Sequence, residues 1–374
     1  MPRPLEIHIF GGSIGESIVI GLPYGGWGVV DNYTPNLDDP DSSATIRFLR
    51  ERKITLEFLC LTHPHDDHVK GVNYLVQNFN FKRFWSFGAL THRQLFALVE
   101  KTLRVKEAMR NDSQEERELT DDLVAALDTA CQRARAGTTE LRRCDLGLVM
   151  YQYQPTQLEP MVKITALGPS GRSSAIYEKT LHACFDKTAS HEILAEKIKG
   201  VNHNQISSGL LVEYGKTRVV LGGDIEQDGW QDVVNYDSPR LDLRSHLIKA
   251  SHHGSTTGYC VRLWEDHFSP VQSVVATITP FSRKGLPRPE GISHIKANCR
   301  QVFTASKSSI KNQQPPLFPA AFQFGQMSAD VVVALQTVFS AARKKSILTQ
   351  GACSFSFDEN GNLSTSMSGD AGVL

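Results

Sequence analysis

Three histidines and two aspartates lie within six consecutive positions of this chain, from His63 to His68. They follow directly on residues 54–61, an apolar run that predicts a buried strand. Imidazole and carboxylate are the ligands that suit zinc, iron and manganese. A solvent-exposed polar loop is the alternative, but packing and solvation do not explain so many ligating groups at a strand end. The segment therefore predicts a metal site, which the fold has to place at the end of a strand.

The spacing within this segment predicts two neighbouring metal positions. In the pattern His-x-His-x-Asp-His, His63 and His65 point one way from the loop. Asp67 and His68 then remain for a second metal beside the first.

A second segment places one carboxylate at the end of another apolar strand. The run Val219–Leu221 ends in Gly222-Gly223-Asp224. Glycines let the backbone come close to a metal centre, and Asp224 has two oxygens with which to bridge two cations. Most strand-end aspartates are turn residues, so this segment alone is weak evidence. Together with the histidine segment it indicates a shared ligand.

A third segment, His252-His253-Gly254-Ser255, follows the predicted strand at 246–250. Adjacent side chains on an extended backbone point in opposite directions. One histidine is therefore expected to be a ligand or a catalytic acid, and the other a packed or supporting residue. A purely structural pair is the alternative.

The rest of the chain alternates between strand and helix patterns. Residues 5–10, 17–20 and 27–30 predict an antiparallel meander. Further strands are predicted at 162–167, 210–214, 218–221 and 272–278, helices at 42–52 and 226–236, and a hairpin at 353–367.

Residues 91–137 are highly charged, with leucines at helical spacing. They predict two amphipathic helices that break near 111–113 and cover one side of the sheet; a lid over the substrate entrance is the alternative. We expect one domain over 1–374, with a helical insertion at 89–200 and a C-terminal extension at 306–374 that ends in the hairpin.

Composition limits where the protein works and what it binds. Lys plus Arg and Asp plus Glu both number 40, so no global basic field favours nucleic acid. The seven cysteines form no CxxC pair, no signal peptide is present, and no apolar run is long enough to span a membrane. These features predict a cytoplasmic protein with reduced thiols and no membrane contact.

The three segments together resemble the metallo-β-lactamase superfamily. Within it, the segments around Asn204-Gln205-Ile206, Leu221–Glu226 and Leu247–Ser255 are most similar to the hydrolase domain of bacterial competence DNA-uptake channel proteins. The resemblance spans about residues 5–305. It implies an α/β fold, a four-layer αβ/βα sandwich with the metals at the sheet edge.

The resemblance also implies roles for individual residues. His63 and His65 would hold a first divalent metal, Asp67 and His68 a second, with Asp224 shared between them. One or two ions are expected, zinc first and manganese as the alternative. They would supply a metal-bound hydroxide that Asp67 helps to orient. Of the His pair, we expect His252 to face the metals and His253 to act catalytically near the leaving group; the reverse remains open.

Two positions depart from the superfamily pattern. A histidine that commonly completes the first site would lie near residue 203, where either His203 or Asn204 could serve. A histidine expected after the next strand is absent near Leu286, which leaves the second site short of a ligand. The nearby Arg283, Lys284 and Arg288 are expected to meet a phosphate, with a solvated loop as the alternative.

These observations favour a metal-dependent hydrolase of phosphodiesters, such as nucleic acid or a nucleotide. The first rival is an amide, ester or thioester hydrolase of the same fold. The second is a metal-binding component of a multi-protein defence or DNA-processing system, encoded with its partners in one operon and little active alone. The substrate, the native metal and the oligomeric state stay open, because fold does not choose between these chemistries.

Overall fold

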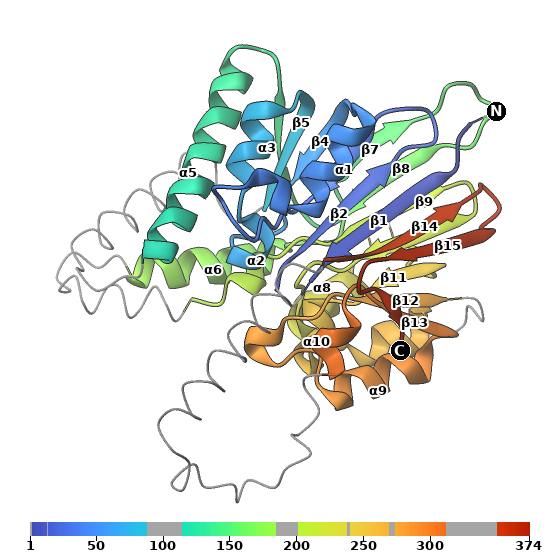
Figure 1. Cartoon of the computed structure of the whole chain (residues 1–374). Helices are drawn as coiled ribbons and strands as arrows, with labels where there is room; N and C mark the ends of the chain where they lie inside the picture. The colour runs from blue at the N-terminus through green and yellow to red at the C-terminus, as the bar shows by residue number, and fades with distance from the viewer. Residues whose placement is uncertain are drawn as a thin grey trace, which may run out of the picture.

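Two mixed β-sheets of eight strands each face one another in the computed structural model (Figure 1). The structure describes residues 2–12, 14–87, 114–184, 201–237, 240–268, 274–311 and 350–374. The first sheet has the order β15-β14-β1-β2-β3-β4-β5-β6, and the second β16-β13-β12-β11-β10-β9-β8-β7.

The strands of the first sheet are β1 (Leu5–Gly11), β2 (Glu16–Gly21), β3 (Trp27–Val30), β4 (Leu56–Cys60), β5 (Phe81–Phe87), β6 (Glu140–Cys144), β14 (Gly351–Phe357) and β15 (Leu363–Ser368). Those of the second are β7 (Val149–Tyr153), β8 (Val162–Ala166), β9 (Leu210–Tyr214), β10 (Thr217–Leu221), β11 (Leu247–Lys249), β12 (Val275–Ile278), β13 (Gln301–Thr304) and β16 (Gly372–Val373). The predicted meander is present, since β1, β2 and β3 pair antiparallel in sequence order.

The period-two pattern of β2 shows how the strands build two cores at once. Ile18 and Ile20 point between the sheets, where they join a buried cluster with Val212 and Val219 of the second sheet. Val19 points the opposite way and joins the cluster under the helices of the first sheet. A strand that is buried on both faces needs consecutive apolar residues, and residues 18–20 of β2 supply them.

Helices cover the outer face of each sheet, which makes four layers (Figure 1). Over the first sheet lie α1 (Ala44–Arg52), α2 (Asp66–Val69), α3 (Val72–Asn78) and α5 (Gln114–Arg135). Against the second sheet pack α8 (Gln227–Val234), the π-helical η5 (Leu263–Phe268) and α9 (Pro289–Asn298). The predicted α/β fold, a four-layer αβ/βα sandwich, is confirmed.

The remaining helical elements are one helix of 14 residues and several shorter ones. They are α6 (Gly171–Cys184), α10 (Lys307–Lys311), and the 3-10 turns η1 (Pro40–Ser42), η2 (His203–Ile206), η3 (His252–Gly254), η4 (Thr256–Gly258) and η6 (Ser282–Lys284). Within the described part of the chain, no helix is both long and apolar enough to cross a lipid bilayer.

The range predicted as a helical insertion, 89–200, also contributes strands to both sheets. It holds α5 and α6, but between them β6 extends the first sheet beside β5, and β7 and β8 form one edge of the second. The edge strand β6 carries exposed charged side chains, so it lacks the apolar alternation of a buried strand. Residues 88–113, with the first predicted helix, and 185–200 lie outside the described residues.

The C-terminal segment completes both sheets. The predicted hairpin is present as β14 and β15, and β14 pairs along its whole length with β1. The last strand, β16, pairs with β13 in the second sheet. Residues 312–349 of the expected extension lie outside the described residues.

Candidate metal centre

The His63–His68 segment lies where β4 ends, and Asp31 at the end of the neighbouring strand β3 holds it in place. Asp31 accepts hydrogen bonds from the backbone N–H of Thr62 (2.8 Å), the Thr62 hydroxyl (2.7 Å) and His68 Nδ1 (2.7 Å). His63 and His68 are fully buried, and Asp67 is 5 % exposed. Asp31 therefore fixes both the strand end and the ring orientation of His68, a supporting carboxylate of the kind found behind metal-ligating histidines.

Asp224 enters the same space from the second sheet. After β10 the backbone turns at Gly223, whose φ is 51°, and a Cβ there would lie 2.5 Å from the Ser208 carbonyl oxygen. The turn brings the Asp224 carboxylate oxygens to 3.6 Å from His63 Nε2 and 3.4 Å from His68 Nε2. The predicted carboxylate thus lies between the histidines assigned to the two metal positions.

His253, and not His252, joins this cluster. His253 Nε2 lies 2.9 Å from Asp67 Oδ2 and 3.6 Å from Asp224 Oδ2, and the residue is fully buried. The His252 ring instead turns toward Thr257 Oγ1 (2.8 Å) and a carboxylate oxygen of Glu226 (3.3 Å). The expectation that His252 faces the other candidate ligands is therefore corrected: His253 faces them.

The physical reason lies in the backbone of η3. Both histidines have positive φ, 47° for His252 and 54° for His253, so the backbone is left-handed and not extended. His253 is held by a hydrogen bond from its Nδ1 to the Thr279 carbonyl oxygen (2.9 Å), which follows β12.

The first site has two neighbours near residue 203. The His203 ring centroid lies 5.5 Å from that of His65, and His203 Nδ1 is hydrogen bonded to the Tyr177 hydroxyl (2.7 Å). Asn204 is buried, with its Nδ2 3.4 Å from His252 Nε2. Among the described residues, the compact donor group here consists of His63, His65 and Asp224.

The position of the absent histidine near 286 is apolar. Leu286 is buried and pairs with Phe281, whose ring lies 5.2 Å from the ring of His253. Lys284, in the same loop, is exposed, and its charge adds to burial in lowering the pKa of His65. Of the predicted phosphate-binding residues, Arg283 and Arg288 are also exposed, with Arg288 directly before α9.

Five buried side-chain atoms in this region have no hydrogen-bond partner: Asp67 Oδ2, His68 Nε2, Asp224 Oδ1, His253 Nε2 and Asn204 Oδ1. The 2.9 Å contact between His253 and Asp67 lacks hydrogen-bond geometry, so both atoms belong to this set. Unsatisfied buried polar atoms are costly and rare in folded proteins. A divalent cation would satisfy the four imidazole and carboxylate atoms, so the residues present fit a metal.

The electrostatics agree with a cation position. Burial alone would raise the pKa of Asp67 and Asp224, but His68 and His253 hold both values below the usual range. Burial lowers the pKa of His63 well below its usual value, so that ring is neutral and free to act as a ligand. The two ionised carboxylates and the neutral His63 ring are donors that divalent ions accept, and a metal would displace the protons of His68 and His253.

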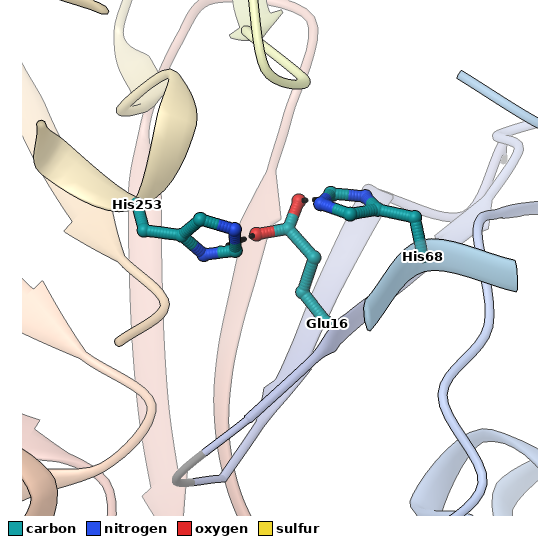
Figure 2. Close-up of side chains that lie close together, drawn as sticks. All are labelled: Glu16, His68 and His253. Carbon is teal, nitrogen blue, oxygen red and sulfur yellow. Dashed lines mark ion pairs between the residues drawn. The ribbon is translucent and has the colours of Figure 1, made fainter. Parts of the chain in front are cut away.

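Glu16, His68 and His253 form a second compact group (Figure 2). Its imidazole atoms are Nδ1, and these already donate to Asp31 and to the Thr279 carbonyl oxygen. We therefore place the cation on the Nε2 side of both rings. Sequence reasoning missed Glu16; the only signal is one acidic residue directly before an apolar run.

A cavity of about 410 Å³ adjoins the cluster. Asn204 and Ser207 line it, and Ser207 Oγ accepts a hydrogen bond from the Asp224 backbone N–H (2.9 Å). Three carboxylates, Glu226, Asp228 and Asp232, and one cation, Arg172, are among its lining residues.

The two adjacent histidines supply a matched pair of variants. We expect His253→Gln to weaken zinc binding by at least about tenfold, because it removes an Nε2 atom from the cluster. His252→Gln should bind zinc within about threefold of wild type, because that ring points elsewhere. Isothermal titration calorimetry on both variants, with unfolding curves to show that they fold, checks this; equal losses would contradict the assignment.

Comparison with known proteins gives a limited result. No family model and no curated protein matches the chain. Among solved structures it is similar to the Zn(2+)-bound PqqB from Methylobacterium extorquens, with a TM-score of 0.32 and 9 % identity over 76 % of this chain and 85 % of that one. At these values the similarity identifies neither a substrate nor an activity for this chain.

Proposed function

We propose that this chain is a metal-dependent hydrolase whose ions are held by His63, His65 and Asp224 and by Asp67, His68 and His253. The observation that carries this proposal is the convergence of unsatisfied, buried Nε2 and carboxylate atoms at one edge of the sandwich. Divalent ions in such a site lower the pKa of water and stabilise charge on the attacked group. Structural packing alone does not account for so many buried ligating atoms without partners.

The chain's own residues would hold and orient the reacting groups. Asp31 and the Thr279 carbonyl oxygen accept from the Nδ1 atoms of His68 and His253, which leaves both Nε2 atoms as lone-pair donors. Asp67, ionised and only 5 % exposed, would orient an attacking water by accepting a hydrogen bond from it.

For the substrate we propose a phosphodiester. Lys284 is close enough to the centre for its charge to act on His65, and it is exposed, so it can meet a phosphoryl oxygen. The motifs that resemble the competence-type domains favour the same class of substrate. Nucleic acid and nucleotides both remain candidates within that class.

The adjoining cavity favours a second candidate. Three carboxylates against one arginine disfavour a further negative charge there, which suits the neutral part of an amide, ester or thioester. The test is turnover by the zinc- or manganese-loaded protein. We expect hydrolysis of bis(p-nitrophenyl) phosphate, or of DNA, RNA or a nucleotide, above that of the chelated protein. Hydrolysis of p-nitrophenyl acetate alone would replace the first candidate by the second.

A further inference from the structure

A buried ion pair lies directly behind the candidate metal centre. Glu16 in β2 is 2 % exposed, and Lys249 in β11 is fully buried. The Lys249 ammonium lies 2.6 Å from Glu16 Oε2 and 3.3 Å from the Gly223 carbonyl oxygen. Because buried charges are costly and apolar pairs often replace them without loss of stability, a structural role does not by itself explain the pair.

The Glu16 carboxylate lies between two histidines from different parts of the sandwich (Figure 2). One of its oxygens is 3.9 Å from His68 Nδ1, and the other is 3.7 Å from His253 Nδ1. It also accepts a hydrogen bond from the Thr279 hydroxyl. His68 comes from α2 over the first sheet, whereas His253 comes from η3 after a strand of the second.

The hydrogen bonds of the two rings each stay within one half of the molecule. Asp31, which holds His68, follows β3 of the first sheet, and Thr279, which holds His253, follows β12 of the second. The contacts of Glu16 with Lys249 and Thr279 cross from the first sheet to the second. Metal sites lose affinity when their ligands are misplaced by fractions of an ångström.

We propose that Glu16 and Lys249 are positioning residues that set the distance between the His68 and His253 halves of the metal centre. Lys249 also helps to position Asp224, because its ammonium donates a hydrogen bond to the carbonyl oxygen of the preceding residue, Gly223. This inference rests on the proposed metal centre. It adds the residues that hold its His68 side and its His253 side at the right distance.

The test measures zinc affinity and stability separately, in Glu16→Gln, Lys249→Met and the double variant. Each single change leaves one buried group unpaired, so we expect loss of stability and a 10- to 100-fold loss of zinc affinity. The double variant should regain stability in the absence of zinc, while its affinity stays at least about tenfold below wild type. A chromophoric chelator in competition measures affinity, and denaturant unfolding of the metal-free protein measures stability.

A matched control and a spectroscopic readout complete the test. The pair Lys163–Glu213, also at 2.6 Å but on neighbouring strands β8 and β9, should be replaceable by Met and Gln without change in zinc affinity. Glu16→Asp keeps the negative charge but shortens the side chain. Because this should shift the metal-binding histidines, it should alter the visible spectrum of the cobalt-substituted protein.

Two outcomes would overturn the proposal, and they differ. If the double variant binds zinc as tightly as wild type, the pair is only structural, and the metal centre itself stands. If wild-type protein binds no zinc and no cobalt, the proposed function fails and this inference fails with it.

Discussion

Replacing Asp224 by alanine is expected to abolish metal binding and to lower turnover by about 10³-fold or more, which corresponds to about 4 kcal/mol of transition-state stabilisation. Its two oxygens lie within 3.4–3.6 Å of Nε2 atoms on His63, His68 and His253. One substitution therefore removes a ligand from both predicted metal positions at once. It also removes a charge that holds the pKa of His68 high.

Elemental analysis of wild type and Asp224→Ala, with a phosphodiesterase assay beside it, measures both effects. Asp66→Asn is the control, because this carboxylate belongs to the same motif but is exposed. The control should keep its metal and its activity. An Asp224→Ala protein that folds and still carries two ions with unchanged turnover would refute the bridging role. One ion or none in wild type, without turnover, would favour a partner-dependent role.

The sequence predicted the parts of this site that depend on local order. His63, His65, Asp67 and His68 share one turn after β4, so their spacing alone brings them together. Asp224 was predictable because the strand pattern and the two glycines mark a strand end. The period-two runs bounded by turns predicted individual strands, whereas the layers were expected only from the resemblance to the metallo-β-lactamase superfamily.

The orientation of the histidine pair was not predictable from local pattern. The expectation assumed an extended backbone, but both His252 and His253 are left-handed. Non-glycine residues adopt this conformation rarely, and here the hydrogen bond from His253 to Thr279 goes with it. That bond joins segments whose proximity depends on the pairing of β11 with β12.

Glu16 and Lys249 show a different limit. A single acidic residue before an apolar run, and a single lysine inside one, each look like an exposed strand position in the sequence. Only the packing of the two sheets against each other puts them 2.6 Å apart and out of solvent. Sequence periodicity carries no information on contacts between sheets.

Zinc affinity is expected to rise steeply between pH 6 and pH 8, because the metal has to displace protons from His68 and His253. Burial alone would lower the pKa of His68, but the surrounding carboxylates, with Asp224 and Asp67 first, raise it well above its usual range. The pKa of His253 is raised against burial by the same two carboxylates. Each displaced proton changes the apparent affinity about tenfold per pH unit, so about 10²- to 10⁴-fold is expected over this interval.

The stability of the metal-free protein should fall as the pH rises above 6.5, whereas its zinc affinity should rise. A histidine whose pKa is raised by folding stabilises the fold fully below the unfolded value of about 6.5, and that contribution is lost as the pH rises through the folded value. His68 and His253 therefore contribute less above pH 6.5. Burial lowers the pKa of His63 and His65, so these two histidines do not make the stability depend on pH above 6.5. The depressed pKa of Asp224 matters only in acid, below about pH 4.

Thermal unfolding at pH 6, 7 and 8, in chelator and in zinc, combines these two effects. The difference in Tm between the zinc-loaded and the metal-free protein should widen as the pH rises, since zinc binds more tightly while the metal-free fold weakens. His246→Gln serves as control, because His246 lies before β11, at the opposite end of that strand from His253. This variant should show the same widening. A difference that stays constant or narrows with rising pH would mean that zinc displaces no protons from His68 and His253, and that their Nε2 atoms do not bind the metal.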